Sequence, residues 1–170
     1  MHVERLEAVR LRFVDAHRRF TARLLTVTAS EATTPPADGG WTPAQIGAHV
    51  AIFNRFAAGL LSGAVPMAQP APPKFIERTW DEIAGVLASR RLEAPARLHP
   101  PASTSREDAL LALEESGDQV EQALRDLPED RAALTFTHPS VGVVSLYQVG
   151  EWAAAHTARH NAQLKRTLGR

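Results

Sequence analysis

Two histidines near the end of the chain, His156 and His160, are the residues whose type and spacing point most directly to chemistry. Residues four apart on a helix lie on the same face, about 5–6 Å apart at Cβ, so two imidazoles can bind one metal ion. The apolar positions of the same helix face are Leu146, Val149, Ala153 and Leu164. Both imidazoles are therefore predicted to point into the protein core.

A third histidine, His49, occupies a similar position on another predicted helix, whose apolar face comprises Ile46, Phe53, Phe56 and Leu60. A buried imidazole without a polar partner costs about 1–3 kcal/mol for each unpaired group. The three histidines therefore either hydrogen-bond within a purely structural core or bind a metal ion. Three histidines with an open coordination position are typical of a catalytic metal site, and we favour the metal.

Other residues are candidates for roles around such a site. Glu151, one turn before His156, could act as a general base, and Trp152 could line a pocket. His138 could reach a substrate. His17 lies beside the apolar face of the first predicted helix, and we expect an edge histidine rather than a ligand.

Gly117 lies in the middle of an otherwise apolar helix face, where glycine costs about 1 kcal/mol relative to alanine. It could leave room for the histidines and their metal, or it could allow close backbone packing. Beside it, Asp118 and Glu114 could orient a ligand imidazole through its second nitrogen, or they are solvated charges.

Composition excludes several classes of protein. The 170 residues suffice for one domain, and Lys plus Arg equals Asp plus Glu at 19 each, so no nucleic-acid surface is expected. The absence of cysteine excludes disulfides and thiolate ligands. A charged N-terminus and the lack of a long apolar run predict no signal peptide and no membrane span, hence a cytoplasmic protein. No motif for a phosphate loop, a dinucleotide fold or an activated nucleophile is present.

Four long helices are predicted to position these residues, at 2–27, 43–62, 105–127 and 145–170. The second helix has the clearest start, with Thr42 as N-cap, Pro43 in the first turn and Gln45 completing a capping box. Ser145 and Gln148 have the same spacing at the last helix.

The connections between these helices differ in character. Residues 31–40 are predicted to be a turn-rich linker, because they contain Pro-Pro and Gly-Gly. The Pro-rich segment 66–104 is predicted to be a loop-rich insertion with one short helix at 80–90. Residues 129–144 are expected to be partly extended and to lie across one end of the helices.

Three stretches resemble motifs of a known family. Residues 40–49 (GWTPAQIGAH) resemble its W-[ST]-x-x-[EQ]-x-x-x-H motif, and residues 156–164 (HTARHNAQL) resemble H-x3-H-x2-Q-[LI]. Residues 137–148 (THPSVGVVSLYQ) resemble the H-P-x-x-G-x-x-[ST]-L approach to the last helix. In order and spacing the chain is similar to the DinB-like proteins, which are named for DNA-damage-inducible genes and are distinct from the polymerase of similar name.

The resemblance implies an all-α, up-down four-helix bundle of DinB type, here one domain over residues 1–170, which is often a homodimer. It implies one divalent metal ion on His49, His156 and His160. Zinc and nickel are the metals expected from the family, with iron and manganese as alternatives, while all-imidazole ligation also suits copper. Asn161 departs from the pattern, because many members carry a further histidine there.

The activities implied by the resemblance act on a small-molecule substrate. One is the transfer of a small thiol of the bacillithiol or mycothiol type, and the other is metal-dependent hydrolysis. The alternative is a non-catalytic bundle of the stress response that binds a metal or a small molecule. The residues themselves leave the substrate and the reaction open.

Overall fold

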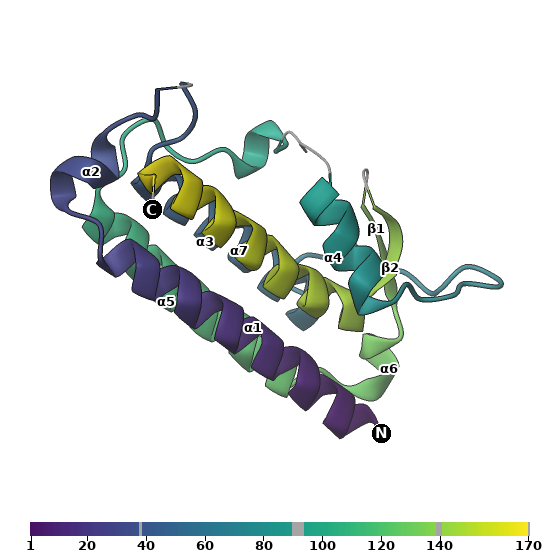
Figure 1. Ribbon diagram of the computed structural model, residues 1–170. Helices are drawn as coiled ribbons and strands as arrows, with labels where there is room; N and C mark the ends of the chain where they lie inside the picture. Colours follow the sequence, from purple (N-terminus) through teal and green to yellow (C-terminus); the bar gives the residue numbers. More distant parts are fainter. Residues whose placement is uncertain (38, 90–93, 139–140, 170) are drawn as a thin grey trace.

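Four long helices packed side by side form the body of the computed structural model, which describes residues 1–37, 39–89, 94–138 and 141–169 (Figure 1). The four are α1 (His2–Leu25), α3 (Pro43–Ser62), α5 (Arg106–Arg125) and α7 (Leu146–Leu168). The predicted all-α four-helix bundle is confirmed. Within the described ranges, no helix combines the length and the apolar character needed to cross a bilayer.

Contacts near the helix ends define the directions of the four helices. Arg23 near the end of α1 donates to Asn161 near the end of α7, and Gly47 near the start of α3 lies against Ala109 near the start of α5. Thus α1 and α7 run in one direction, and α3 and α5 run in the other (Figure 1). The directions are therefore up-down-down-up rather than strictly alternating, because the chain returns along the bundle between the end of α3 and the start of α5.

Each of the two helices that carry the candidate ligands begins at a capping box. Thr42 and Gln45 exchange side-chain to backbone bonds at the start of α3, and Ser145 and Gln148 do so at the start of α7. Both predicted capping boxes are confirmed. An N-cap contributes about 1 kcal/mol, and it also fixes the residue at which the helical phase begins.

Apolar side chains on the inward faces form two separate clusters of buried residues. The first includes Val9, Phe13, Phe53, Val120 and Val149. The second includes Phe20, Leu24, Ile46, Leu113 and Leu164. Burial of each such side chain stabilises the fold by about 1.5–3 kcal/mol, so the bundle is held chiefly by these two clusters.

The insertion between α3 and α5 contains the expected short helix, α4 (Trp80–Ser89), and a 3-10 turn, η1 (Ala96–Leu98). Ile83 and Leu87 of α4 are buried in the first cluster, and α4 packs along α7. The turn η1 packs on α3. The insertion is therefore attached to both helices that carry the candidate ligands.

Two short α-helices were not predicted, nor was the strand pairing of the connection that was expected to be partly extended. A short helix, α2 (Ala29–Thr33), overlaps the start of the predicted turn-rich linker at 31–40. It forms because Thr28 and Glu31 make a capping box ahead of the prolines. A second short helix is α6 (Glu129–Ala132), and the extended connection is an antiparallel hairpin of β1 (Thr135–His138) and β2 (Gly142–Ser145). Arg90, Pro139, Ser140 and Arg170, which belong to predicted elements or motifs, lie outside the described residues.

Gly150 generates a prediction about the packing of α7. A Cβ at this position would lie 2.7 Å from Cγ1 of Val9 and 2.8 Å from Cδ2 of Leu124, both in buried side chains. We expect Gly150→Ala to lower the free energy of unfolding by about 1–3 kcal/mol through overpacking, against a gain of about 1 kcal/mol in helix propensity. Urea denaturation of the purified variant measures the difference.

Gly85→Ala is the matched control, because Gly85 is also helical but has no heavy atom within 4 Å of its added Cβ. This substitution is expected to leave stability unchanged or raise it by up to about 1 kcal/mol. A stabilising effect of Gly150→Ala would show that the helices do not pack as closely as described.

Candidate metal centre

Three imidazoles from two helices converge in the interior of the bundle. His49 on α3 and His156 and His160 on α7 are all buried. The Nε2 atom of His156 lies 3.1 Å from Nε2 of His49 and 3.1 Å from Nε2 of His160. One potential ligand atom from each ring lies within 4.8 Å of the other two. The structure thus brings together the three histidines that the sequence singled out.

The outer nitrogens of two rings have fixed acceptors. Nδ1 of His49 donates to the carbonyl oxygen of Leu98 at 2.7 Å, and Nδ1 of His160 donates to Oε1 of Gln163 at 2.7 Å. Because a carbonyl and an amide oxygen only accept, both rings carry their proton on Nδ1. Each Nε2 atom therefore has its lone pair directed toward the other rings, which is the tautomer that a metal-binding histidine requires.

The donor set fits a divalent cation. Nε2 of His156 can carry one proton at most, but it faces two acceptors, Nε2 of His49 and Nε2 of His160. Without a cation, the lone pairs of at least one of these two pairs would therefore face each other at 3.1 Å in a buried site. Nδ1 of His156 is also buried and has no hydrogen-bond partner among the described residues. Three neutral imidazole nitrogens suit zinc, nickel, copper or iron(II) and leave a coordination position for a further ligand.

Burial keeps the three imidazoles in the neutral form. Desolvation lowers the pKa of His160 to about 3 and lowers the pKa of His49. It also lowers the pKa of His156 well below its ordinary value, with smaller contributions from the two neighbouring histidines. At neutral pH all three rings are therefore uncharged, and protons do not compete with a cation for their lone pairs.

Aromatic side chains fix the orientation of the rings. Phe53 stacks on His156 with centroids 4.0 Å apart, and Trp41 lies 4.7 Å from the ring of His49. Trp152 packs edge-on against Phe53 at 4.8 Å. These apolar walls exclude water from the ring faces, and the lower local polarity strengthens electrostatic interactions at the open edge of the site.

His138 lies on the same side of the bundle as the three histidines. Its ring centroid is 4.2 Å from that of Trp152. Burial, with a smaller contribution from Arg97, lowers the pKa of His138 to about 4, so this imidazole is neutral at pH 7. Nδ1 accepts the backbone N–H of Val141 at 3.2 Å, which places its proton on Nε2.

Glu151 has contacts on a different side of α7. Its carboxylate lies 3.6 Å from Arg12 of α1, and burial raises its pKa while Arg5 and Arg12 lower it. The groups that act on this carboxylate thus belong to α1 and to Glu77, and none is one of the three histidines. These contacts give no support to Glu151 as a general base, although it is buried as a site residue would be.

Gly117 makes room for a different histidine from those expected. A Cβ at this position would lie 2.6 Å from Cε1 of His17, whose ring also packs 5.5 Å from that of Phe13. His17 is half-buried and separate from the cluster of three, as predicted for an edge histidine. The glycine therefore accommodates His17, and the interpretation that it leaves space for the metal was wrong.

Orientation of the ligand rings comes from groups other than those expected. Asp118 and Glu114 are exposed, which confirms the solvated alternative, and Leu98 and Gln163 supply the acceptors instead. Gln163 follows His160 by three residues, a helical spacing that could have identified it. Asn161 accepts a hydrogen bond from Arg23 at 2.7 Å and ties α7 to α1.

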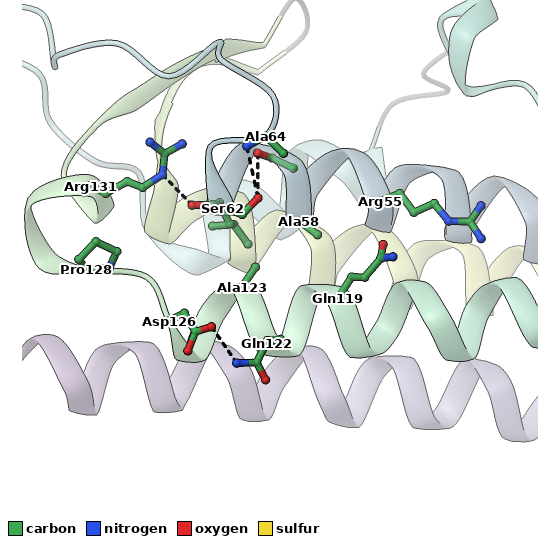
Figure 2. Close-up of a pocket in the computed structure, with 12 residues that line it drawn as sticks. Arg55, Ala58, Ser62, Ala64, Gln119, Gln122, Ala123, Asp126, Pro128 and Arg131 are labelled. Atoms are coloured by element: carbon green, nitrogen blue, oxygen red, sulfur yellow. Dashed lines mark hydrogen bonds between the residues drawn. The ribbon is translucent and has the colours of Figure 1, made fainter.

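A cleft of about 590 Å³ lies at another part of the bundle, between α3 and α5 (Figure 2). Arg55, Ser62, Gln119, Gln122 and Arg131 are among the residues that line it, and none of the lining residues is a histidine. Two bonds from Arg131 to the carbonyls of Leu60 and Leu61 close the end of α3 beside this cleft. The cleft is thus separate from the three histidines.

Comparison with known proteins supports this description. A sequence model of the DinB superfamily matches residues 12–164. Among solved structures, the chain is similar to YfiT from Bacillus subtilis, a probable metal-dependent hydrolase with an unusual four-helix bundle topology, at 22% identity and a TM-score of 0.57 over 96% of this chain and 87% of YfiT. No curated protein matches the chain significantly. Because the family model matches most of the chain, we conclude that the protein belongs to the DinB superfamily.

Proposed function

We propose that this protein is a divalent-metal-dependent enzyme acting on a small molecule, with His49, His156 and His160 as the metal ligands. The observation that carries the proposal is the convergence of their three Nε2 atoms, with His156 3.1 Å from each of the other two. The fixed Nδ1 protons of His49 and His160 support it, because they leave Nε2 free to bind a cation.

A divalent cation in this position would supply Lewis acidity, which polarises a carbonyl group or lowers the pKa of a water or thiol nucleophile. The chain's own residues would position the substrate. Trp152 and Phe53 offer apolar surface beside the histidines. His138, which is neutral because burial lowers its pKa to about 4, packs on Trp152 and would add to that surface.

Two reactions are compatible with these residues. The fold shared with YfiT, a probable metal-dependent hydrolase, favours hydrolysis. The second candidate is transfer of a small thiol of the bacillithiol or mycothiol type. Both reactions start from a nucleophile, water or a thiol, whose pKa the metal would lower.

Several narrower expectations accompany the proposal. Zinc or nickel is the expected metal, since three imidazoles suit either ion, and iron and manganese remain alternatives. We also expect one domain over residues 1–170, a homodimer and a cytoplasmic location. In the alternative proposal, the same site binds a metal or small molecule in the stress response without turnover.

Removal of the metal tests the proposal first. We expect elemental analysis of protein purified without chelator to find about one divalent ion per chain, and chelation to lower the melting temperature. An ion present at 100 times its Kd stabilises the folded state by about 2.7 kcal/mol. His160→Ala and His156→Leu should abolish this metal-dependent stabilisation. In a purely structural bundle, chelation would have no effect and His156→Leu would be neutral or stabilising.

Turnover tests the catalytic part of the proposal and separates its two reactions. Metal-loaded protein is assayed with activated esters and amides for hydrolysis, and with a small thiol plus an aryl halide for transfer. Activity should be lost on chelation and in His160→Ala. Saturable binding of metal with no turnover in either assay would instead support the non-catalytic alternative.

Gln163 provides a finer test, because its amide oxygen holds the proton of His160 on Nδ1. We expect Gln163→Leu to weaken metal binding by about 10–100-fold, as is typical when the group that orients a ligand histidine is lost. Gln163→Glu keeps an acceptor at the same position and should retain most of the affinity. Competition with a chromophoric chelator measures both, and equal affinities of the two variants would contradict this role of Gln163.

A further inference from the structure

A short segment of the insertion, residues 94–102, lies against the first half of α3. The carbonyl oxygen of Leu98 accepts Nδ1–H of His49 at 2.7 Å. The side-chain amide of Gln45 donates to the carbonyl oxygens of Pro101 and Ala102 at 3.1 and 3.2 Å. Gln45 precedes His49 by four residues, so both contacts come from one face of α3. The segment is thus attached to α3 at a proposed metal ligand and again one turn before it.

The two attachments are joined by a stiff piece of chain. Only His99 and Pro100 separate Leu98 from Pro101. A proline ring fixes its own φ and favours an extended conformation for the residue before it. His99 has such a conformation, with φ −67° and ψ 137°. The contact of Gln45 with Pro101 therefore also sets the position of the Leu98 carbonyl group.

Apolar burial contributes little to the docking of this segment. None of residues 94–102 is buried, and the side chain of Leu98 is half-buried at the edge of the first apolar cluster. Trp41 fills the space beside the segment, with its ring centroid 4.7 Å from that of His49 and 6.0 Å from that of His99. Segments with few buried apolar contacts open most easily. The polar contacts of His49 and Gln45 therefore make a large contribution to docking.

A cation and the docked segment select the same state of His49. The Leu98 carbonyl oxygen can only accept, so it requires the ring proton on Nδ1. A metal bound at Nε2 requires the same tautomer. If the proton moved to Nε2, 3.1 Å from Nε2 of His156, the Leu98 carbonyl would face a lone pair and lose its bond. Two partners that select one state of a ring favour each other's binding, by the same factor in both directions.

We propose that docking of residues 94–102 and occupation of the metal site stabilise each other, with Gln45 as a positioning residue that acts on His49 through the Leu98 carbonyl. The segment is docked on α3 when the site is occupied and is released when the cation is lost. The inference rests on the proposed function, because it requires a cation on the three histidines.

Amide hydrogen exchange of the full parent chain tests the coupling. Zinc-loaded protein and chelator-treated protein are compared by NMR at the amides of Leu98 and His99, which close η1. We expect zinc to slow the exchange of both amides by about tenfold, the lower end of the effect of groups that orient ligand histidines. The amide of Phe75, which donates to Pro72 at 3.1 Å in an earlier turn of the insertion, should exchange equally in both states.

A pair of uncharged variants tests the reverse direction. Gln45→Ala removes the two bonds to the segment and half of the capping box at Thr42. Thr42→Ala disrupts the same capping box from the other side and leaves the amide of Gln45 in place, so it is the matched control. We expect Gln45→Ala to bind zinc about tenfold more weakly than Thr42→Ala does, measured by competition with a chromophoric chelator. Melting temperatures without metal verify that both variants are folded.

Failure of the inference and failure of the proposed function give different results. If zinc binds but leaves the exchange of the Leu98 and His99 amides unchanged, the segment is docked regardless of the metal and the inference is wrong. Equal zinc affinities of Gln45→Ala and Thr42→Ala would also overturn it. In both cases the metal site stands. If the parent protein takes up no divalent ion, the proposed function itself is wrong, and the inference fails with it.

Discussion

Imidazole nitrogens placed inside an apolar bundle are the constraint on which the rest of the structure depends. Each unpaired buried nitrogen is costly, and the structure gives an acceptor to Nδ1 of two of the three rings and brings the Nε2 atoms of all three together. The Nε2 atoms of His49, His156 and His160 meet one another, which requires that α3 and α7 have one defined rotation about their axes. The capping boxes at Thr42 and Ser145 set where each helix begins, and burial of the apolar face of each helix sets that rotation.

The topology of the bundle explains why the insertion takes part in the site. Because α3 and α5 are parallel neighbours, the chain must travel back along the bundle between them. That return path places η1 against α3, where Leu98 accepts the proton of His49. Gln45 also donates to the carbonyls of Pro101 and Ala102, which fixes the insertion at the start of α3. A segment required by connectivity thus also supplies polar groups to the site.

Sequence patterns predicted the parts of this structure that depend on local periodicity. The four long helices and the convergence of the three histidines follow from inward apolar faces and capping residues, which are local signals. The acceptor at Leu98 is a backbone carbonyl in a loop and carries no signature in the sequence. Glu151 lies on another face of α7 than His156, because five residues turn a helix by about 140°, and its carboxylate lies near Arg12 of α1. The residue that packs against Gly117 is His17, which lies on another helix, so this contact depends on tertiary packing and not on local sequence.

The bundle interior holds polar residues on all four helices beside its two apolar clusters. On α1, the half-buried His17 lies in the sequence between Phe13 of one cluster and Phe20 of the other. The buried polar residues on the other three helices include His49 and Asn54 on α3, Ser116 on α5, and His156, Thr157 and His160 on α7. A large apolar side chain at such a position would stabilise the fold by about 1.5–3 kcal/mol. Among the described residues, one nitrogen each of His17 and His156 and the amide of Asn54 have no hydrogen-bond partner, which adds to the cost. A bundle selected for stability alone would not keep the three histidines in its interior, which argues that they have a role beyond packing.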